Sequence, residues 1–146
     1  MPDERIHVRP GTESDLLAVA AIQILCPESA HWEAHEYLKY DLLVAESSGT
    51  LSGFVVVGPL PLGEGEILNL AVAPEWRRKG VARKLLEGVR KRYPGDLYLE
   101  VRESNQAAQK FYQSIGFQAV GRREGYYEFP PEAAIVMTFH SCYCHK

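Results

Sequence analysis

The sequence of 146 residues has no run of 18 apolar residues, the length that a membrane-spanning helix needs. Its first ten residues, MPDERIHVRP, carry charges where a secretory signal has its apolar stretch. Cysteine is also scarce, because Cys26, Cys142 and Cys144 are too few and too unevenly spaced for a disulfide-stabilised secreted fold. We therefore expect a cytoplasmic protein with reduced thiols and no membrane partner.

The composition fits one compact domain. Hydrophobic residues make up 46% of the chain and charged residues 24%, and the length lies within the usual size of a single domain. No internal repeat and no low-complexity linker interrupts the sequence. We expect a single domain over residues 1–146, with residues 141–146 as a flexible tail, acting as a monomer or a homodimer.

The charges are distributed unevenly along the chain. The net charge is only -3, but residues 1–76 are strongly acidic and residues 77–146 are basic. Half of the 16 basic residues lie in one short stretch, at Arg77, Arg78, Lys79, Arg83, Lys84, Arg90, Lys91 and Arg92. A sequence pI of about 6.0 argues against a protein built to bind nucleic acid. The pattern favours a compact anionic ligand beside this stretch.

The hydrophobic pattern predicts strands and helices mixed along the chain. Strands are expected at residues 6–9, 42–46, 51–57, 67–73, 97–102, 117–120 and 134–139, and helices at residues 12–26, 31–40, 81–93 and 105–114. Thr12 is a candidate N-cap, as is either Ser104 or Asn105, and Pro94 with Gly95 ends the third helix. This order is typical of a three-layer α/β/α sandwich.

One junction of strand, loop and helix is the segment that indicates the function most clearly. The apolar strand ILNLAVA is followed by the loop PEWRRKG and by the amphipathic helix VARKLLEGVRKR. The start of a helix offers unpaired N–H groups and a partial positive charge, which together suit phosphate oxygens. The loop lacks G-x-x-x-x-G-K-[ST], and Gly63 and Gly65 begin a G-x-G-x-x-G pattern that Leu68 interrupts. No G-x-S-x-G nucleophile motif is present either.

The hexapeptide RRKGVA resembles R/Q-x-x-G-x-G/A, the pyrophosphate-binding signature of acetyl-CoA in the GNAT N-acetyltransferases. The order of elements over residues 3–140 is similar to that of this family. The stretch LEVRESNQAAQKFYQSIGF and the following GRREGYY resemble its ribosomal-protein-alanine (RimI) branch. Ala73 and Ala82 depart from that branch, which usually has Asp and Gly there, and residues 27–41 and 59–66 show no clear match. The resemblance implies a GNAT-like sandwich whose mixed sheet is mostly antiparallel.

The resemblance also implies how acetyl-CoA would bind. Backbone groups of Leu70, Ala71 and Val72 would pair with the pantetheine arm, and the Val72 N–H would face the thioester oxygen. The pyrophosphate would lie on the loop and helix start formed by Arg77, Arg78, Lys79, Gly80, Val81, Ala82 and Arg83. Asn105 is interpreted either as a plain helix cap or as a further hydrogen-bond partner of the cofactor.

The resemblance assigns catalysis to two residues. Glu100 would accept the proton of the attacking amine, directly or through water, although a mid-strand glutamate can also be a solvated or ion-paired surface residue. Tyr112 would protonate the departing thiolate, or it packs at the edge of the core. Tyr126 and Tyr127 would contact the acceptor peptide, or they are aromatic residues at a strand end.

The expected reaction is acetyl transfer from acetyl-CoA to a primary amine by direct attack, through a tetrahedral intermediate. The expected acceptor is a protein N-terminal α-amine, such as that of a ribosomal protein. A small-molecule amine, a lysine, and a non-catalytic acetyl-CoA-binding regulatory domain remain as alternatives. A further alternative is an RNA- or ribosome-binding module that uses the basic residues Arg83, Lys84, Arg90, Lys91 and Arg92. We expect no resident metal, although His140, Cys142, Cys144 and His145 leave a metal-binding tail open, and no direct nucleic-acid partner.

Overall fold

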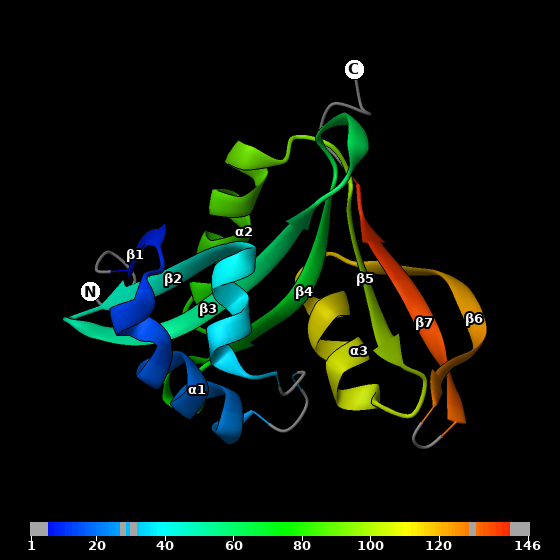
Figure 1. Ribbon diagram of the computed structural model, residues 1–146, viewed down its shortest axis with the longest axis horizontal. Coiled ribbons are helices and arrows are strands. Elements are labelled where there is room, and N and C mark those ends of the chain that lie inside the picture. Colours follow the sequence, from blue (N-terminus) through cyan, green and yellow to red (C-terminus); the bar gives the residue numbers. More distant parts are fainter. Residues whose placement is uncertain (1–5, 27–28, 30–31, 129–130, 141–146) are drawn as a thin grey trace. The chain divides into compact units, whose positions relative to one another are not determined.

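The computed structural model describes residues 6–26, 29, 32–128 and 131–140. Of Tyr127 and Glu128 it describes the backbone only. The chain forms two compact units. The first consists of residues 1–58 and 67–92, and the second of residues 59–66 and 93–146. Figure 1 labels the α-helices and strands.

The first unit contains an antiparallel set of strands. β1 (Ile6–Pro10) pairs with β2 (Asp41–Ser47), which pairs with β3 (Thr50–Pro59). β4 (Gly65–Val72) follows β3 in the strand order. The turn between β2 and β3 is Ser48-Gly49, with φ of 54° and 79°. Positive φ at both central residues matches the twist of a two-residue hairpin, so the SSG sequence predicts this turn well.

Helices cover both faces of these strands. After the short 3-10 helix η2 (Glu13–Asp15), α1 (Leu16–Leu25) packs Val19 and Ile22 against Val44 and Phe54. A second 3-10 helix, η3 (Ala34–Lys39), adds the buried Tyr37 to the same cluster. On the other face, after η5 (Pro74–Trp76), α2 (Val81–Arg92) buries the apolar stripe Val81, Leu85, Leu86 and Val89.

The second unit contains the start of β4, the short helix η4 (Pro61–Gly63), and a second group of strands. The first two residues of β4 pair in parallel with β5 (Leu97–Arg102), and β5 pairs antiparallel with β7 (Pro131–Phe139). β7 pairs antiparallel with β6 (Gln118–Glu128). α3 (Gln106–Ser114) contributes Tyr112 to an aromatic row with Phe117 and Phe139.

The predicted α/β class, with a mixed and mostly antiparallel sheet, is confirmed. Two expectations need correction. The helix expected over residues 31–40 is a 3-10 helix over Ala34–Lys39. The strand expected over residues 117–120 continues to Glu128, because the polar segment GRREGYYE also pairs with β7. Residues 121–126 are exposed, so this part of the strand has no hydrophobic alternation. No helix in the described residues has the length and apolar character that crossing a membrane requires.

Candidate active site

In the first unit, the end of β4 is tied to the loop that follows it. The Val72 carbonyl accepts a hydrogen bond from the Arg77 guanidinium, Nε to O 3.3 Å, and another from the Cys26 thiol, also 3.3 Å. Arg77 also donates from Nη2 to Cys26 Sγ over 3.4 Å. Cys26 is fully buried at the end of α1. These bonds hold the start of the basic loop against the carboxyl end of β4.

The basic loop has the backbone shape that an anion site needs. Arg78 has φ of 63° and Gly80 has φ of 89°, and α2 begins at Val81, immediately after them. Alternating backbone conformations of this kind turn successive N–H groups toward one side, where they form a concave site for anions. A Cβ at Gly80 would have no heavy atom within 4 Å, so the loop is open at this point. Arg78, Lys79 and Gly80 are exposed.

Gly53 of β3 brings the start of α2 close to β4. A Cβ at Gly53 would lie 2.8 Å from the Ala71 carbonyl oxygen and 3.0 Å from Val81 Cγ1. Only a hydrogen fits between strand and helix here, and the first turn of α2 therefore lies directly over β3 and β4. A glycine inside a strand is the sequence signal for such a close approach, and Gly53 within the apolar run LSGFVVV carries it.

A buried polar cluster supports β4 from the side of α1. The Asn69 amide donates to the Tyr37 hydroxyl (2.9 Å) and to Gln23 Oε1 (3.1 Å), and Tyr37 donates to the same oxygen. Gln23 donates to the Trp32 carbonyl over 2.7 Å. Burial raises the pKa of the Tyr37 phenol, which therefore stays a hydrogen-bond donor. Asn69 Oδ1 accepts from the Leu70 N–H over 3.0 Å, so the cluster reaches the backbone of the predicted pantetheine strand.

In the second unit, Glu100 lies at the centre of a charged group. Glu66 and Tyr98 are register partners on β4 and β5, which places Glu66 and Glu100 on one face. The Arg123 guanidinium lies 2.6 Å from Glu100 Oε2 and stacks over the Tyr126 ring at 4.4 Å. Burial, and then the charge of Glu100, raise the pKa of Glu66. A hydrogen bond with Glu100 raises the pKa of Tyr126.

Two further predicted residues lie on α3 or at its start. Asn105 Oδ1 accepts from the Ala108 N–H over 3.0 Å, so Asn105, and not Ser104, is the cap of this helix. Tyr112 is 8% exposed, with its ring 5.3 Å from Phe111 and 5.6 Å from Phe117. Tyr112 therefore packs against its aromatic neighbours, as one of its two interpretations expects. A role in proton transfer would be additional to this packing.

The structure groups the predicted residues by unit. The first unit holds the predicted acetyl-CoA residues of β4 and of the loop, and the second holds Glu100, Tyr126, Asn105 and Tyr112. Sequence reasoning missed Glu66 and Arg123, whose link to Glu100 depends on strand register and on the extension of β6. The Tyr127 side chain lies outside the described part, as does the tail with Cys142, Cys144 and His145. His140 is described, 3.4 Å from Asp96.

A search against protein families matches residues 16–117 to the acetyltransferase (GNAT) family. The chain belongs to the GNAT family. Members of this family take an acetyl group from acetyl-CoA. The open basic loop before α2 fits its pyrophosphate. Arg77 fits that role only through its backbone, because its side chain is directed to Val72 and Cys26.

Several characterised GNAT proteins are similar to this chain. The [ribosomal protein bS18]-alanine N-acetyltransferase of Escherichia coli is 35% identical over 111 residues, 72% of each chain. Its counterpart in Haemophilus ducreyi is 40% identical over 86 residues, and the N-alpha-acetyltransferase RimI of Mycobacterium tuberculosis is 39% identical over 97. The matches span 54% and 64% of this chain, and 59% and 61% of those two proteins.

Solved GNAT structures agree on the fold. The crystal structure of the Escherichia coli ribosomal-protein-S18-alanine N-acetyltransferase superposes with a TM-score of 0.71 at 28% identity, covering 93% of this chain and 94% of that one. A GNAT family acetyltransferase from Elizabethkingia anophelis with acetyl-CoA bound gives 0.69 at 20% identity, covering 94% and 99%.

Proposed function

We propose that this protein is an acetyl-CoA-dependent N-acetyltransferase that acts on a protein N-terminal α-amine, of the ribosomal protein alanine type. The observation that carries the proposal is the pair of carboxylates Glu66 and Glu100, which lie on one face of the second unit with Tyr126 beside them. Arg123 offsets one of the two negative charges, and the remaining net negative charge of this face favours a cationic amine. The similarity to the Escherichia coli bS18-alanine enzyme over 72% of the chain supports the same acceptor class.

The first unit would bind the acetyl donor, which supplies a reactive thioester. Backbone groups of Leu70, Ala71 and Val72 would pair with the pantetheine arm, and the Val72 N–H would stabilise the negative charge that develops on the thioester oxygen. The N–H groups of residues 77–83 would hold the pyrophosphate, with basic side chains adding attraction. Arg77 would act as a positioning residue that keeps this loop against β4. Asn105 would donate a further hydrogen bond to the donor from its amide.

The second unit would supply the groups that accept and donate protons during acetyl transfer. The amine attacks the thioester carbon directly and forms a tetrahedral intermediate, which then expels the CoA thiolate. Glu100 would take the amine proton, directly or through water, and Tyr112 would give a proton to the thiolate. An N-terminal α-amine has a pKa of about 8, against about 10.4 for lysine, so a carboxylate base suits the former better. Tyr126 and Tyr127 would contact the first residues of the acceptor.

We also propose a domain organisation, an oligomeric state and a location for the protein. The two compact units would work as one GNAT domain over residues 1–146, as a monomer or a homodimer. The cytoplasm is the proposed location, because acetyl-CoA and newly made ribosomal proteins meet there.

The proposal is tested by acetyl-CoA turnover, followed as thiol release. The acceptors are short peptides with a free N-terminal alanine, an N-blocked lysine peptide and small amines. We expect turnover on the alanine peptide, at least about a hundredfold loss in Glu100→Gln and a smaller loss of kcat in Tyr112→Phe, with acetyl-CoA affinity kept in both.

Two other outcomes would replace the proposal. Turnover only on a small amine or on the lysine peptide would keep the chemistry and change the substrate. Tight acetyl-CoA binding without turnover on any acceptor would indicate a regulatory domain. The exposed Lys110→Ala variant on α3 is the control for nonspecific loss of activity.

A further inference from the structure

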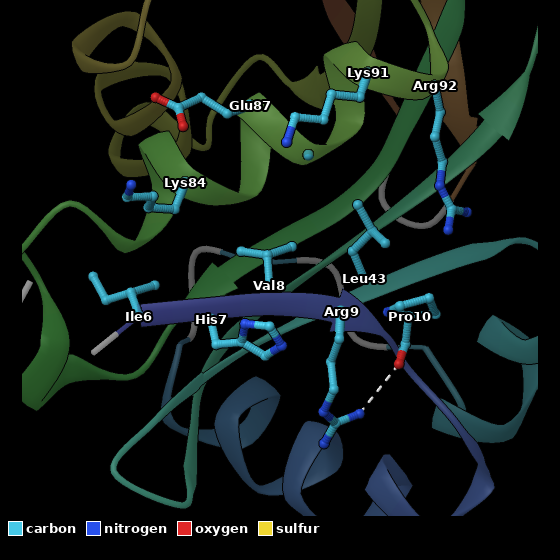
Figure 2. Close-up of a pocket in the computed structure, with 11 residues that line it drawn as sticks. Ile6, His7, Val8, Arg9, Pro10, Leu43, Lys84, Glu87, Lys91 and Arg92 are labelled. Atoms are coloured by element: carbon cyan, nitrogen blue, oxygen red, sulfur yellow. Dashed lines mark hydrogen bonds between the residues drawn. The ribbon is translucent and has the colours of Figure 1, made fainter. Parts of the chain in front are cut away.

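A groove lies between β1 and α2 of the first unit (Figure 2). Its volume is about 450 Å³. Figure 2 shows Ile6 and Val8 directed toward α2, while His7 and Arg9 point to the opposite face of β1. A Cβ at Gly88 would lie 3.1 Å from Val8 Cγ1 and 3.3 Å from Leu43 Cδ1, so helix and strands meet closely along an apolar floor.

β1 is the last strand of its sheet, and its outer edge borders this groove. In the strand order of the described residues, β2 is its only neighbour. The Gly11 N–H donates to the Leu42 carbonyl over 2.8 Å, which fixes the side that faces β2. Because antiparallel pairing alternates, the backbone groups of Arg9 and His7 also face β2, and those of Val8 and Ile6 face outward. Pro10, which has no N–H, is on the outward side, as edge strands tolerate.

The helix side of the groove is basic. Lys84 and Lys91 are exposed, and neither lies within ion-pair distance of a carboxylate in the described residues. Arg92 extends toward the end of β1 and pairs with Asp41 over 3.1 Å. The Glu87 carboxylate, the only acidic group that lines the groove, points away from β1 in Figure 2. Lys84 and Lys91 are two helical turns apart, which corresponds to a rise of roughly 10 Å along the helix axis. Three to four residues of an extended chain cover about the same distance.

We propose that this groove is a docking site for an extended acidic segment of another protein. The segment adds to β1 as a further strand through the outward backbone groups of Val8, and alternate carboxylate side chains contact Lys84 and Lys91. Strand addition takes its affinity from main-chain hydrogen bonds and its specificity from side chains on one face. A nucleic acid would use the lysines alone, whereas an acidic peptide uses the strand edge, the apolar floor and the lysines together.

The test uses three probes on the full chain: an N-acetylated peptide of alternating Glu and Thr, the same peptide with Gln in place of Glu, and an oligouridylate of similar length. The blocked N-terminus prevents the peptide from acting as an acetyl acceptor. Amide NMR shifts and hydrogen exchange report on β1. With the acidic peptide we expect a shift of the Val8 amide and slower exchange there, while the His7 and Arg9 amides stay protected throughout.

Charge variants complete the test. The double variant Lys84→Glu with Lys91→Glu should weaken binding of the acidic peptide by at least about tenfold. Lys110→Glu, exposed on α3, is the control for net charge. Equal binding of the Gln peptide, no protection of the Val8 amide, or tighter binding of the oligouridylate at the same amides would each overturn the proposal.

Discussion

Arg77 donates a hydrogen bond from Nε to the carbonyl oxygen of Val72, 3.3 Å away, and so joins the first residue of the RRKGVA motif to the end of β4. Arg77→Ala leaves that carbonyl with the Cys26 thiol, a weaker donor. We expect KM for acetyl-CoA to rise by about tenfold and kcat to change little, because the loop loses its anchor while the catalytic groups remain.

Arg77→Lys is the matched control, because it keeps the positive charge but not the two separate donors. If charge alone mattered, this variant would restore KM. A KM near that of Arg77→Ala supports positioning, and full recovery of the wild-type value would contradict it.

Substitution of Gly53 should disturb both stability and acetyl-CoA binding. An added Cβ lies 2.8 Å from a backbone oxygen, which cannot move aside as a side chain can. Gly53→Ala should therefore lower the free energy of unfolding by about 1–3 kcal/mol and raise KM for acetyl-CoA, measured by denaturant melts and initial rates. Gly121→Ala is the control, because nothing lies within 4 Å of its added Cβ. Equal stability of the two variants would refute the close approach.

The raised pKa of Glu66 depends partly on Glu100. Burial is the larger cause and the negative charge of Glu100 the next, and both disfavour the charged form of Glu66. Glu100→Gln should therefore lower the pKa of Glu66 toward the ordinary glutamate value, as seen by ¹³C NMR of its carboxyl carbon. Glu103→Gln, which removes an exposed carboxylate paired with Arg122, should leave it unchanged. An unchanged Glu66 pKa in Glu100→Gln would mean that the two groups do not interact.

Acid should weaken the fold through Asp15. Arg9 donates two hydrogen bonds of 2.9 Å to this carboxylate and lowers its pKa from 3.8 to about 2. A lowered pKa stabilises the fold above the unfolded value, and this contribution disappears as the pH falls through about 2. It amounts to about 2 kcal/mol at neutral pH.

Asp15→Asn keeps an oxygen for the Thr12 N–H but removes the charge. The stability difference between wild type and this variant should be largest above about pH 4 and should shrink toward pH 2, measured by urea unfolding. Glu13→Gln, an exposed carboxylate in the same turn, is the control. A difference that is constant with pH would show that the ion pair contributes nothing.

The sequence predicts those parts of the fold that rest on local pattern. The stripe of Val81, Leu85 and Val89 and the alternation in LYLEVR gave α2 and β5 almost to the residue. The helix over Ala34–Lys39 is harder to predict, because its buried aromatic residue Tyr37 packs into a cluster built by α1 and β3 instead of belonging to an apolar stripe of helical period. Residues 121–126 of β6 are exposed, so their sequence has no hydrophobic alternation from which a strand could be predicted.

Only those parts of the candidate site that belong to a sequence motif could be predicted from the sequence. RRKGVA and LEVRESN pointed to the loop and to Glu100. The partners of Glu100 depend on the register of β4 against β5 and on the course of β6, which are properties of tertiary structure. In the same way, nothing local indicates that the Arg77 side chain turns back to Val72.

The buried cluster of Gln23, Tyr37 and Asn69 has a consequence for how this sequence can diverge. Each member satisfies the other two, and the described chain contains no buried side-chain polar atom without a partner. A substitution at one position leaves a buried donor or acceptor of the other two residues without a hydrogen-bond partner. Replacing all three residues together by apolar residues of similar volume does not. These three positions should therefore covary among relatives. A lineage should keep all three residues, or replace all three within a short evolutionary interval.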